Sequence, residues 1–275
     1  MFNGNVITTR DGIIDGLANN NDRMVIDKAS LANAVAGQYF SLWTATGAPS
    51  TGTVPSTAVV PTEATTGAIG FTDQSNPVTS YLAWLSIVSG NNTTNLEIHD
   101  RLACMGGLSG TVTTAQGALD LPTLAPSSAR LGASDYSDVQ WWLEIYTALG
   151  ATGVNATVNV TYNDDSTGNL TAIALGATPR AGRLYPLISA SAGKWIKKVN
   201  SVTLSATTGT AGNFGITATR PRTMVSTLLA NKAETFDWAQ LGFPEIPNDS
   251  CLMMLMCCST TTTGTVRGQG KIIHG

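Results

Sequence analysis

The feature that most constrains the fold of this chain is the regular recurrence of short β-strand patterns over most of its length. From Tyr81 onward, segments rich in β-branched and aromatic residues alternate with turns of Gly, Asn and Pro, and few helical patterns lie between them. The segments are 81–89, 95–104, 139–148, 155–176, 184–189, 199–208, 212–219, 251–259 and 264–273. Strands spaced in this way predict antiparallel sheets arranged as a sandwich, jelly roll or barrel, not a parallel α/β sheet.

One hairpin in this series can be drawn residue by residue. Val158, Val160 and Tyr162 alternate with polar residues, which is the two-residue period of a strand with one buried face. A second run, 170–175, follows the turn-forming letters NDDSTG. The acidic tip at 164–165 offers too few oxygen ligands for a calcium loop, so we interpret it as a solvated turn.

The run CLMMLMCC at 251–258 is apolar on both faces, which predicts a central strand covered on each side. It is too short to span a bilayer. The four cysteines, Cys104, Cys251, Cys257 and Cys258, follow neither a zinc spacing nor a small disulfide framework. The opening letters MFNGNVITTRDG lack the pattern of a signal peptide. We therefore expect the chain to fold in a cytoplasm with its thiols buried and reduced.

The N-terminal part of the sequence has a different character. Residues 1–26 hold Gly, Asn and Asp among short apolar pairs, which indicates an extended arm with few contacts of its own. The letters DKASLANAVAG at 27–37 predict a helix, because Leu31 and Val35 lie at helical spacing and Gly37 ends the pattern. A helix this short must dock against another element to persist.

A strand is predicted at 39–45, followed by a Thr- and Pro-rich linker at 46–67. A loop of this length points to function or to contact with a neighbouring chain. A second short helix is predicted within 229–241. The sequence thus predicts an all-β fold, an antiparallel β-sandwich or jelly roll with an extended N-terminal arm and one or two short helices. The arm, helix and linker occupy 1–75, and the β-sandwich body occupies 76–275.

Residues that carry chemistry are sparse. Charged residues are only 12% of the chain and the net charge is -3, so we expect neither nucleic acid nor membrane as a partner. Of the two histidines, His99 alternates with apolar neighbours in a strand pattern, and His274 is the penultimate residue. Glu97, Asp100 and Glu144 could form an acid–base pair, yet spacing alone cannot bring two of them together. We expect no enzymatic activity, no cofactor and no metal.

Two short motifs have ordinary structural interpretations. The glycine-rich letters GGLSG at 106–110 lack the Lys and Ser/Thr that end a phosphate-binding loop, so they predict a turn. Arg220, Pro221 and Arg222 form a basic spot too small for nucleic-acid binding, and we interpret it as a salt-bridging surface element.

Trp141 and Trp142 must face opposite sides of the strand that holds them. Both faces can be covered within the subunit, or one indole can lie exposed for a protein partner, because interfaces are enriched in aromatic residues. Sugar stacking is a third interpretation, although no companion cluster of acids and amides accompanies these tryptophans in the sequence.

Three segments, 99–116, 139–164 and 199–222, resemble structural proteins of tailed bacteriophages, of the kind that decorates or cements the head. The resemblance implies an all-β subunit, a homotrimer, that sits on the capsid surface of the virion and locks neighbouring major capsid subunits together. Its partners would be the major capsid protein and other copies of itself. The resemblance brings no catalytic residues.

We expect the first 70 or so residues, with two aromatic positions of the body, to supply the interface. The candidates are Ile13, Ile14, Leu31, Val35, Trp43, Val54, Val59, Val60, Trp142 and Tyr146. The alternative is a tail or head fibre that recognises host surface glycans, since such a protein would also be β-rich and trimeric. A hydrolase built on His99 is the enzyme alternative.

Overall fold

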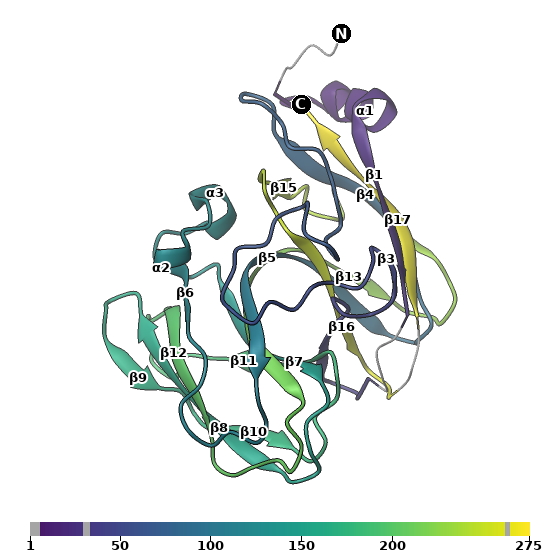
Figure 1. Ribbon diagram of the computed structural model, residues 1–275. Helices are drawn as coiled ribbons and strands as arrows, with labels where there is room; N and C mark the ends of the chain where they lie inside the picture. The colour runs from purple at the N-terminus through teal and green to yellow at the C-terminus, as the bar shows by residue number, and fades with distance from the viewer. Residues whose placement is uncertain (1–5, 30–33, 262–264) are drawn as a thin grey trace.

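The computed structural model describes residues 6–29, 34–261 and 265–275 (Figure 1). Within these residues the chain forms seventeen strands and three short helices. Every pair of neighbouring strands is antiparallel. The all-β, antiparallel fold class predicted from the sequence is confirmed.

The helices are α1 (Arg10–Asn19), α2 (Leu121–Leu124) and α3 (Ser128–Leu131). The strands of the N-terminal half are β1 (Asn21–Lys28), β2 (Tyr39–Ser41), β3 (Gly47–Ala48), β4 (Ser80–Ser89), β5 (Thr94–Leu108) and β6 (Leu119–Asp120). They are followed by β7 (Gln140–Thr147), β8 (Val154–Tyr162), β9 (Thr167–Asn169), β10 (Ile173–Gly176), β11 (Arg183–Leu187) and β12 (Ile196–Leu204). The last strands are β13 (Asn213–Thr227), β14 (Glu234–Asp237), β15 (Glu245–Ile246), β16 (Leu252–Cys258) and β17 (Val266–His274).

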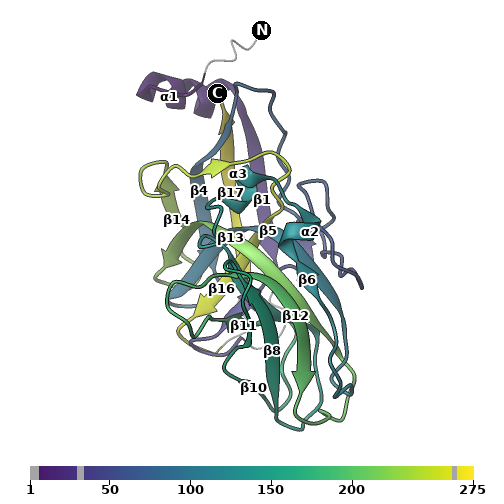
Figure 2. The ribbon, with the colours of Figure 1, turned by 90° about the vertical axis from the view of Figure 1, so that its left-hand side faces the viewer.

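A closed barrel of six strands, in the order β11-β2-β16-β5-β13-β7, forms the centre of the molecule. A sheet ordered β14-β4-β17-β1-β3, with β15 paired to β4, lies at one end. A second sheet, ordered β10-β8-β12-β6 with β9 paired to β8, lies at the other end. Figures 1 and 2 show the barrel between these two sheets, so the molecule is elongated.

Three hydrophobic clusters fill this architecture. One cluster lies between the barrel and the β8–β12 sheet and includes Leu143, Val158 and Phe214. A second lies between the barrel and the β4–β17 sheet and includes Ile98 and Met254. The third cluster fills the barrel interior. Barrel strands are therefore covered on both faces, and the run predicted to be a central strand forms β16, between β2 and β5.

The predicted hairpin, strand and linker are found in the structure with changed bounds. The hairpin is confirmed, since β8 pairs with both β9 and β10, although β10 begins only at Ile173. The strand predicted at 39–45 is shorter and ends at Ser41. The predicted linker at 46–67 holds β3 and a bridge between Val59 and Cys104, so it runs along the barrel. The four thiols are free, and Cys257 alone among them is not fully buried.

The extended arm predicted at 1–26 is wrong for the described residues of that range. Residues 10–19 form α1, where the Thr9 hydroxyl accepts a hydrogen bond of 3.1 Å from the Gly12 amide. β1 then pairs with β17 from Asn21 to Lys28. In the second half of β1, buried and exposed side chains alternate with the two-residue period of a strand. The partner strand β17 supplies backbone hydrogen bonds to β1, whereas an isolated short helix has no such partner and is only marginally stable.

Both predicted helices are corrected. The helix predicted at 27–37 does not include residues 27–28, which end β1; Leu31 lies at 30–33, outside the described residues. The helix predicted at 229–241 is replaced by β14, which pairs with β4, and by a turn. The Asp237 carboxylate organises that turn by accepting hydrogen bonds from the amides of Ala239 and Gln240, a local alternative to helix formation.

Lys28, the last residue of β1, provides a prediction about pH. Its buried ammonium donates to the carbonyl oxygens of Ala45 and Ser50, at 3.1 and 3.2 Å, and burial lowers the pKa of Lys28 from 10.5 to about 8. Between these two pH values the unfolded chain binds the proton and the folded chain does not, so the contribution of Lys28 to stability rises with pH.

We expect the wild-type protein to gain about 1 kcal/mol of unfolding free energy relative to Lys28→Met between pH 7.5 and 10.5, after allowance for solvent screening. Urea unfolding of both proteins at several pH values measures this difference. Comparison with the variant cancels the titration of tyrosines and cysteines, and a difference that stays constant with pH would contradict the prediction.

Candidate functional site

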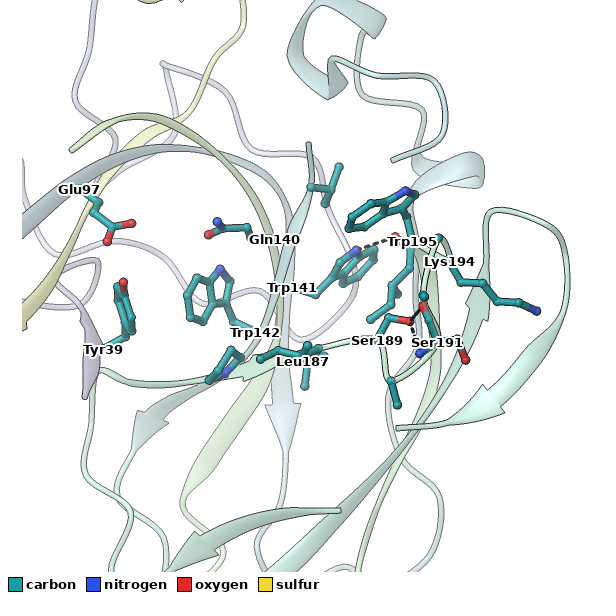
Figure 3. A pocket seen from close by; sticks show the side chains of 17 residues that line it. Tyr39, Glu97, Gln140, Trp141, Trp142, Leu187, Ser189, Ser191, Lys194 and Trp195 are labelled. Carbon is teal, nitrogen blue, oxygen red and sulfur yellow. Dashed lines mark hydrogen bonds between the residues drawn. The ribbon is translucent and has the colours of Figure 1, made fainter. Parts of the chain in front are cut away.

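A cavity of about 640 Å³ opens beside β7, β11 and the loop that joins β11 to β12. We call it the aromatic groove, and its principal lining residues are Tyr39, Glu97, Gln140, Trp141, Trp142, Ile188 and Trp195. Figure 3 shows that Tyr39 and Glu97 lie on one side of β7 and Trp141 and Trp195 on the other. Its volume falls in the range of about 300–1,000 Å³ typical of small-molecule sites.

The two adjacent tryptophans of β7 face opposite sides of the barrel wall and are both buried. Trp141 belongs to the cluster outside the barrel, where its indole N–H donates to the carbonyl oxygen of Ile196 at 2.8 Å. Trp142 belongs to the interior cluster, and its N–H donates to the Thr219 hydroxyl at 2.9 Å. Of the interpretations left open by the sequence, coverage of both indoles within the subunit is therefore confirmed.

Trp195 is the exposed aromatic residue of the groove, with 40% of its surface accessible. The tip of the β8–β9 hairpin fixes its backbone: the Trp195 amide donates to the side-chain oxygen of Asn163 at 3.1 Å, and the Asn163 amide donates to the Trp195 carbonyl oxygen at 2.9 Å. Lys194 forms an ion pair of 2.8 Å with Asp164 at the same tip. The predicted solvated turn is thus joined to the loop between β11 and β12 by this ion pair, and to β12 by a second pair between Lys197 and Asp165.

Glu97 supplies a carboxylate at the opposite side of the groove. It accepts a hydrogen bond of 2.8 Å from Nε2 of His99, whose Nδ1 lies 3.0 Å from the Thr219 hydroxyl. Burial by itself raises the pKa of Glu97, but the hydrogen bonds from His99 and from the Tyr39 hydroxyl lower it by more, so the carboxylate is ionised at neutral pH. Burial first, and then Glu97, raises the pKa of Tyr39 to about 12.

The acids considered as a catalytic pair do not converge, because each is bonded to a different partner. Glu97 pairs with His99, whereas the Glu144 carboxylate accepts from Arg101 at 2.8 Å inside the barrel. Asp100 accepts from Arg130 at 2.7 Å and from Arg222 at 3.0 Å. Arg222 is therefore a buried ion-pair partner, not the surface element that the sequence predicted. Arg220 does form a partly exposed pair, 3.4 Å from Asp138.

Sequence reasoning passed over His274, which the fold places between a serine and a carboxylate. Its Nδ1 lies 2.9 Å from the Ser80 hydroxyl oxygen, and its Nε2 lies 3.1 Å from Oδ2 of Asp22. In nucleophilic catalysis the serine oxygen must reach a substrate carbonyl. Ser80 is 1% exposed at the start of β4, where it lies between β15 and β17, so these contacts fasten β17 to β4 and β1.

A cluster of three acidic residues was also not predicted from the sequence. Single carboxylate oxygens of Glu63, Asp73 and Asp249 lie within 4.8 Å of one another. Burial, followed by the charges of Asp73 and Asp249, raises the pKa of Glu63. Oxygen ligands of this kind suit hard cations, but exposed acids also gather without an ion, and we assign no metal site to them.

The interface candidates from the sequence do not form one surface. Trp43, Trp142 and Tyr146 lie in the barrel interior with Val54 packed against them, so burial removes the three aromatic side chains from contact with another molecule. On α1, Ile13 faces the body and is buried with Ile273, whereas Ile14 is 63% exposed. Half-buried positions are Val35, Val59 and Val60.

Another exposed apolar group lies at the end of β13. Met224, Leu228 and Leu229 are 59%, 62% and 55% exposed, and we call these three residues the β13 patch. Met224 is paired across the β13–β5 ladder with Glu97, which lines the aromatic groove. The sequence interpretation assigned 229–241 to a helix and did not consider these residues as a surface.

Within the described residues, no helix has the length and apolar character needed to cross a membrane. No protein-family model matches this sequence, and no curated protein matches it. A structure of the infectious bursal disease virus Gx strain is 11% identical, with a TM-score of 0.17, over 93% of this chain and 81% of that chain. The VP2 subviral particle of the same virus is 10% identical, with a TM-score of 0.16 and the same coverage. Similarity at this level does not establish a shared fold.

Proposed function

We propose that this chain is a structural protein of a virion, of the capsid-decoration type that its sequence resembles, and that it binds the outer surface of an assembled shell. The observation that carries the proposal is the β13 patch, where three large apolar side chains that are more than half exposed fall within six residues of the chain. Exposed large apolar side chains grouped in this way on a soluble protein favour a protein-binding site.

The barrel and its two flanking sheets suit a structural protein that binds its partner through a surface of fixed shape. The barrel strands are covered on both faces, and the buried Arg101–Glu144 and Arg130–Asp100 pairs link neighbouring segments, so the body presents a fixed surface to a repeated partner. A protein that binds only the assembled shell stabilises that shell by mass action. Trimeric copies would multiply a modest affinity per subunit into firm attachment.

The proposed attachment surface differs from the arm expected from the sequence. Residues 10–28 form α1 and a central strand of a sheet, so deleting them would remove part of the fold and could not test attachment. The β13 patch can be changed without loss of a strand pairing, because its side chains point to solvent.

The test is co-sedimentation of the purified chain with shells assembled without it. We expect saturable binding, and we expect the combined variant Met224→Ser, Leu228→Ser and Leu229→Ser to bind at least about 100-fold more weakly, since each buried Leu or Met contributes roughly 1.5 kcal/mol or more. Ile14→Ser is the matched control, because Ile14 is equally exposed but lies on α1. Absence of wild-type binding, or equal loss in the control, would contradict the proposal.

A further inference from the structure

The aromatic groove combines flat apolar surfaces with hydrogen-bonding groups that come from separate parts of the chain. Trp195 and Ile188 form an exposed apolar rim, the latter 70% exposed. Gln140, at the start of β7, presents an exposed amide between the two sides of the cavity (Figure 3). Glu97 contributes an acceptor on the far side. The acids and amides that the sequence did not place beside the tryptophans are thus brought there by the closed barrel.

The exposed indole is held ready for a flat ligand. Two backbone hydrogen bonds to Asn163 and the Lys194–Asp164 ion pair hold the loop on both sides of the Trp195 Cα atom. A platform fixed before binding loses little conformational entropy when a ligand stacks on it. The negative face of the indole attracts the partly positive C–H groups that line one face of a sugar ring.

The polar groups of the groove suit a neutral ligand that carries hydroxyl groups. The Glu97 carboxylate has up to about four acceptor sites, of which His99 and Tyr39 use two. Lys194 is already paired with Asp164. A purely apolar ligand would cover the remaining acceptor sites of Glu97 without a partner, which is unfavourable. Hydroxyl donors would satisfy those sites, and the Gln140 amide can both donate and accept.

We propose that the aromatic groove binds an oligosaccharide, with one ring stacked on Trp195 and hydroxyls of this ring or of a neighbouring ring bonded to Gln140 and Glu97. This inference does not depend on the decoration role, because it concerns the chain in solution and different side chains from those of the β13 patch. On a protein that is bound to a shell, such a site would allow the particle to recognise a surface that carries glycans. No covalent step is involved.

The test uses the whole purified chain on a glycan array, followed by tryptophan-fluorescence titration with maltotriose, N,N′,N″-triacetylchitotriose, lactose and the array ligand that binds most tightly. We expect saturable binding with a blue shift of the emission, as the sugar shields Trp195. Trp195→Ala should weaken binding about tenfold or more, the effect of losing one stacking contact. Trp195→Phe should retain part of the affinity, and Gln140→Ala should weaken it several-fold.

Ile14→Ala is the control, since it removes an exposed apolar side chain from α1 and should leave sugar binding unchanged. Far-UV circular dichroism of each variant reports on folding, which the two exposed groove positions should not disturb. The proposal is overturned if no array glycan binds, or if both Trp195→Ala and Gln140→Ala bind the same glycan as tightly as wild type. The proposal is also overturned if the groove binds L-arginine methyl ester and none of the sugars, since it would then recognise a cation.

Discussion

Replacement of Asp100 by asparagine is expected to lower the free energy of unfolding by about 3–5 kcal/mol. Asp100 is fully buried and accepts hydrogen bonds from two arginines, from the Ser250 hydroxyl at 3.1 Å and from the Cys251 amide at 3.0 Å. Asparagine keeps the size of the side chain but leaves Arg130 and Arg222 buried without a negative charge. Its amide N–H₂ would also face donors where the carboxylate presented acceptors.

Urea unfolding followed by circular dichroism measures this loss. Asp138→Asn is the matched control, because Asp138 pairs with Arg220 at 3.4 Å and both side chains are partly exposed. Exposed pairs of this kind contribute about 0–1 kcal/mol. If both substitutions cost the same small amount, the Asp100 cluster is not closed to solvent as described, and the assignment of Arg222 as a buried ion-pair partner fails.

Strands with a strong local pattern could be predicted from the sequence. The alternation of Val158, Val160 and Tyr162 gives one buried face, and the uniformly apolar run at 251–258 gives a strand between two others. Both patterns depend only on neighbouring residues and on the two-residue period of a strand. Whether the sheets close into a barrel depends on pairings such as β11 with β2, between segments distant in sequence, and no local pattern encodes them.

The errors at the N-terminus have a specific cause. Met24 and Ile26 alternate with exposed residues, but Lys28 continues the buried face with a charged residue, which obscures the pattern. The Ala-rich letters that follow suit a helix equally well by propensity. Pairing with β17 along all of β1 decided the outcome, and that pairing requires a partner almost at the other end of the chain.

The groove could not be assembled from the sequence for the same reason. Tyr39, Glu97 and Trp142 come from three strands of the barrel, and only barrel closure brings them to one cavity. No local sequence pattern marks Trp195 as a binding residue. The hairpin that was simplest to predict turns out to hold this residue, because Asn163 at its tip fixes the Trp195 backbone. A hairpin without reactive residues can therefore matter to binding through the position of a neighbouring loop.

Gly215→Ala is the second substitution with a large expected effect, because Gly215 lies where β13 and β5 meet in the barrel wall. A Cβ atom at this position would lie 1.8 Å from the Met105 carbonyl oxygen and 2.7 Å from the Cα atom of Gly106. Both are main-chain atoms of β5, so no side-chain rotation relieves the overlap. The two strands would have to separate and lose ladder hydrogen bonds, and we expect destabilisation of about 4 kcal/mol or more, or failure to fold.

Gly168→Ala is the control, since its Cβ atom would meet only the Tyr162 ring at 3.6 Å, an ordinary contact distance. Its effect should stay within about 0.5 kcal/mol. Soluble yield and urea unfolding compare the two variants. Because β13 also pairs with β7 at Glu144, a folded Gly215→Ala protein should show altered near-ultraviolet dichroism of the neighbouring Trp142. If Gly215→Ala has wild-type stability and an unchanged spectrum, β5 and β13 are not in direct main-chain contact at this point. The closed barrel would then be contradicted, and so would the groove, since barrel closure brings its residues together.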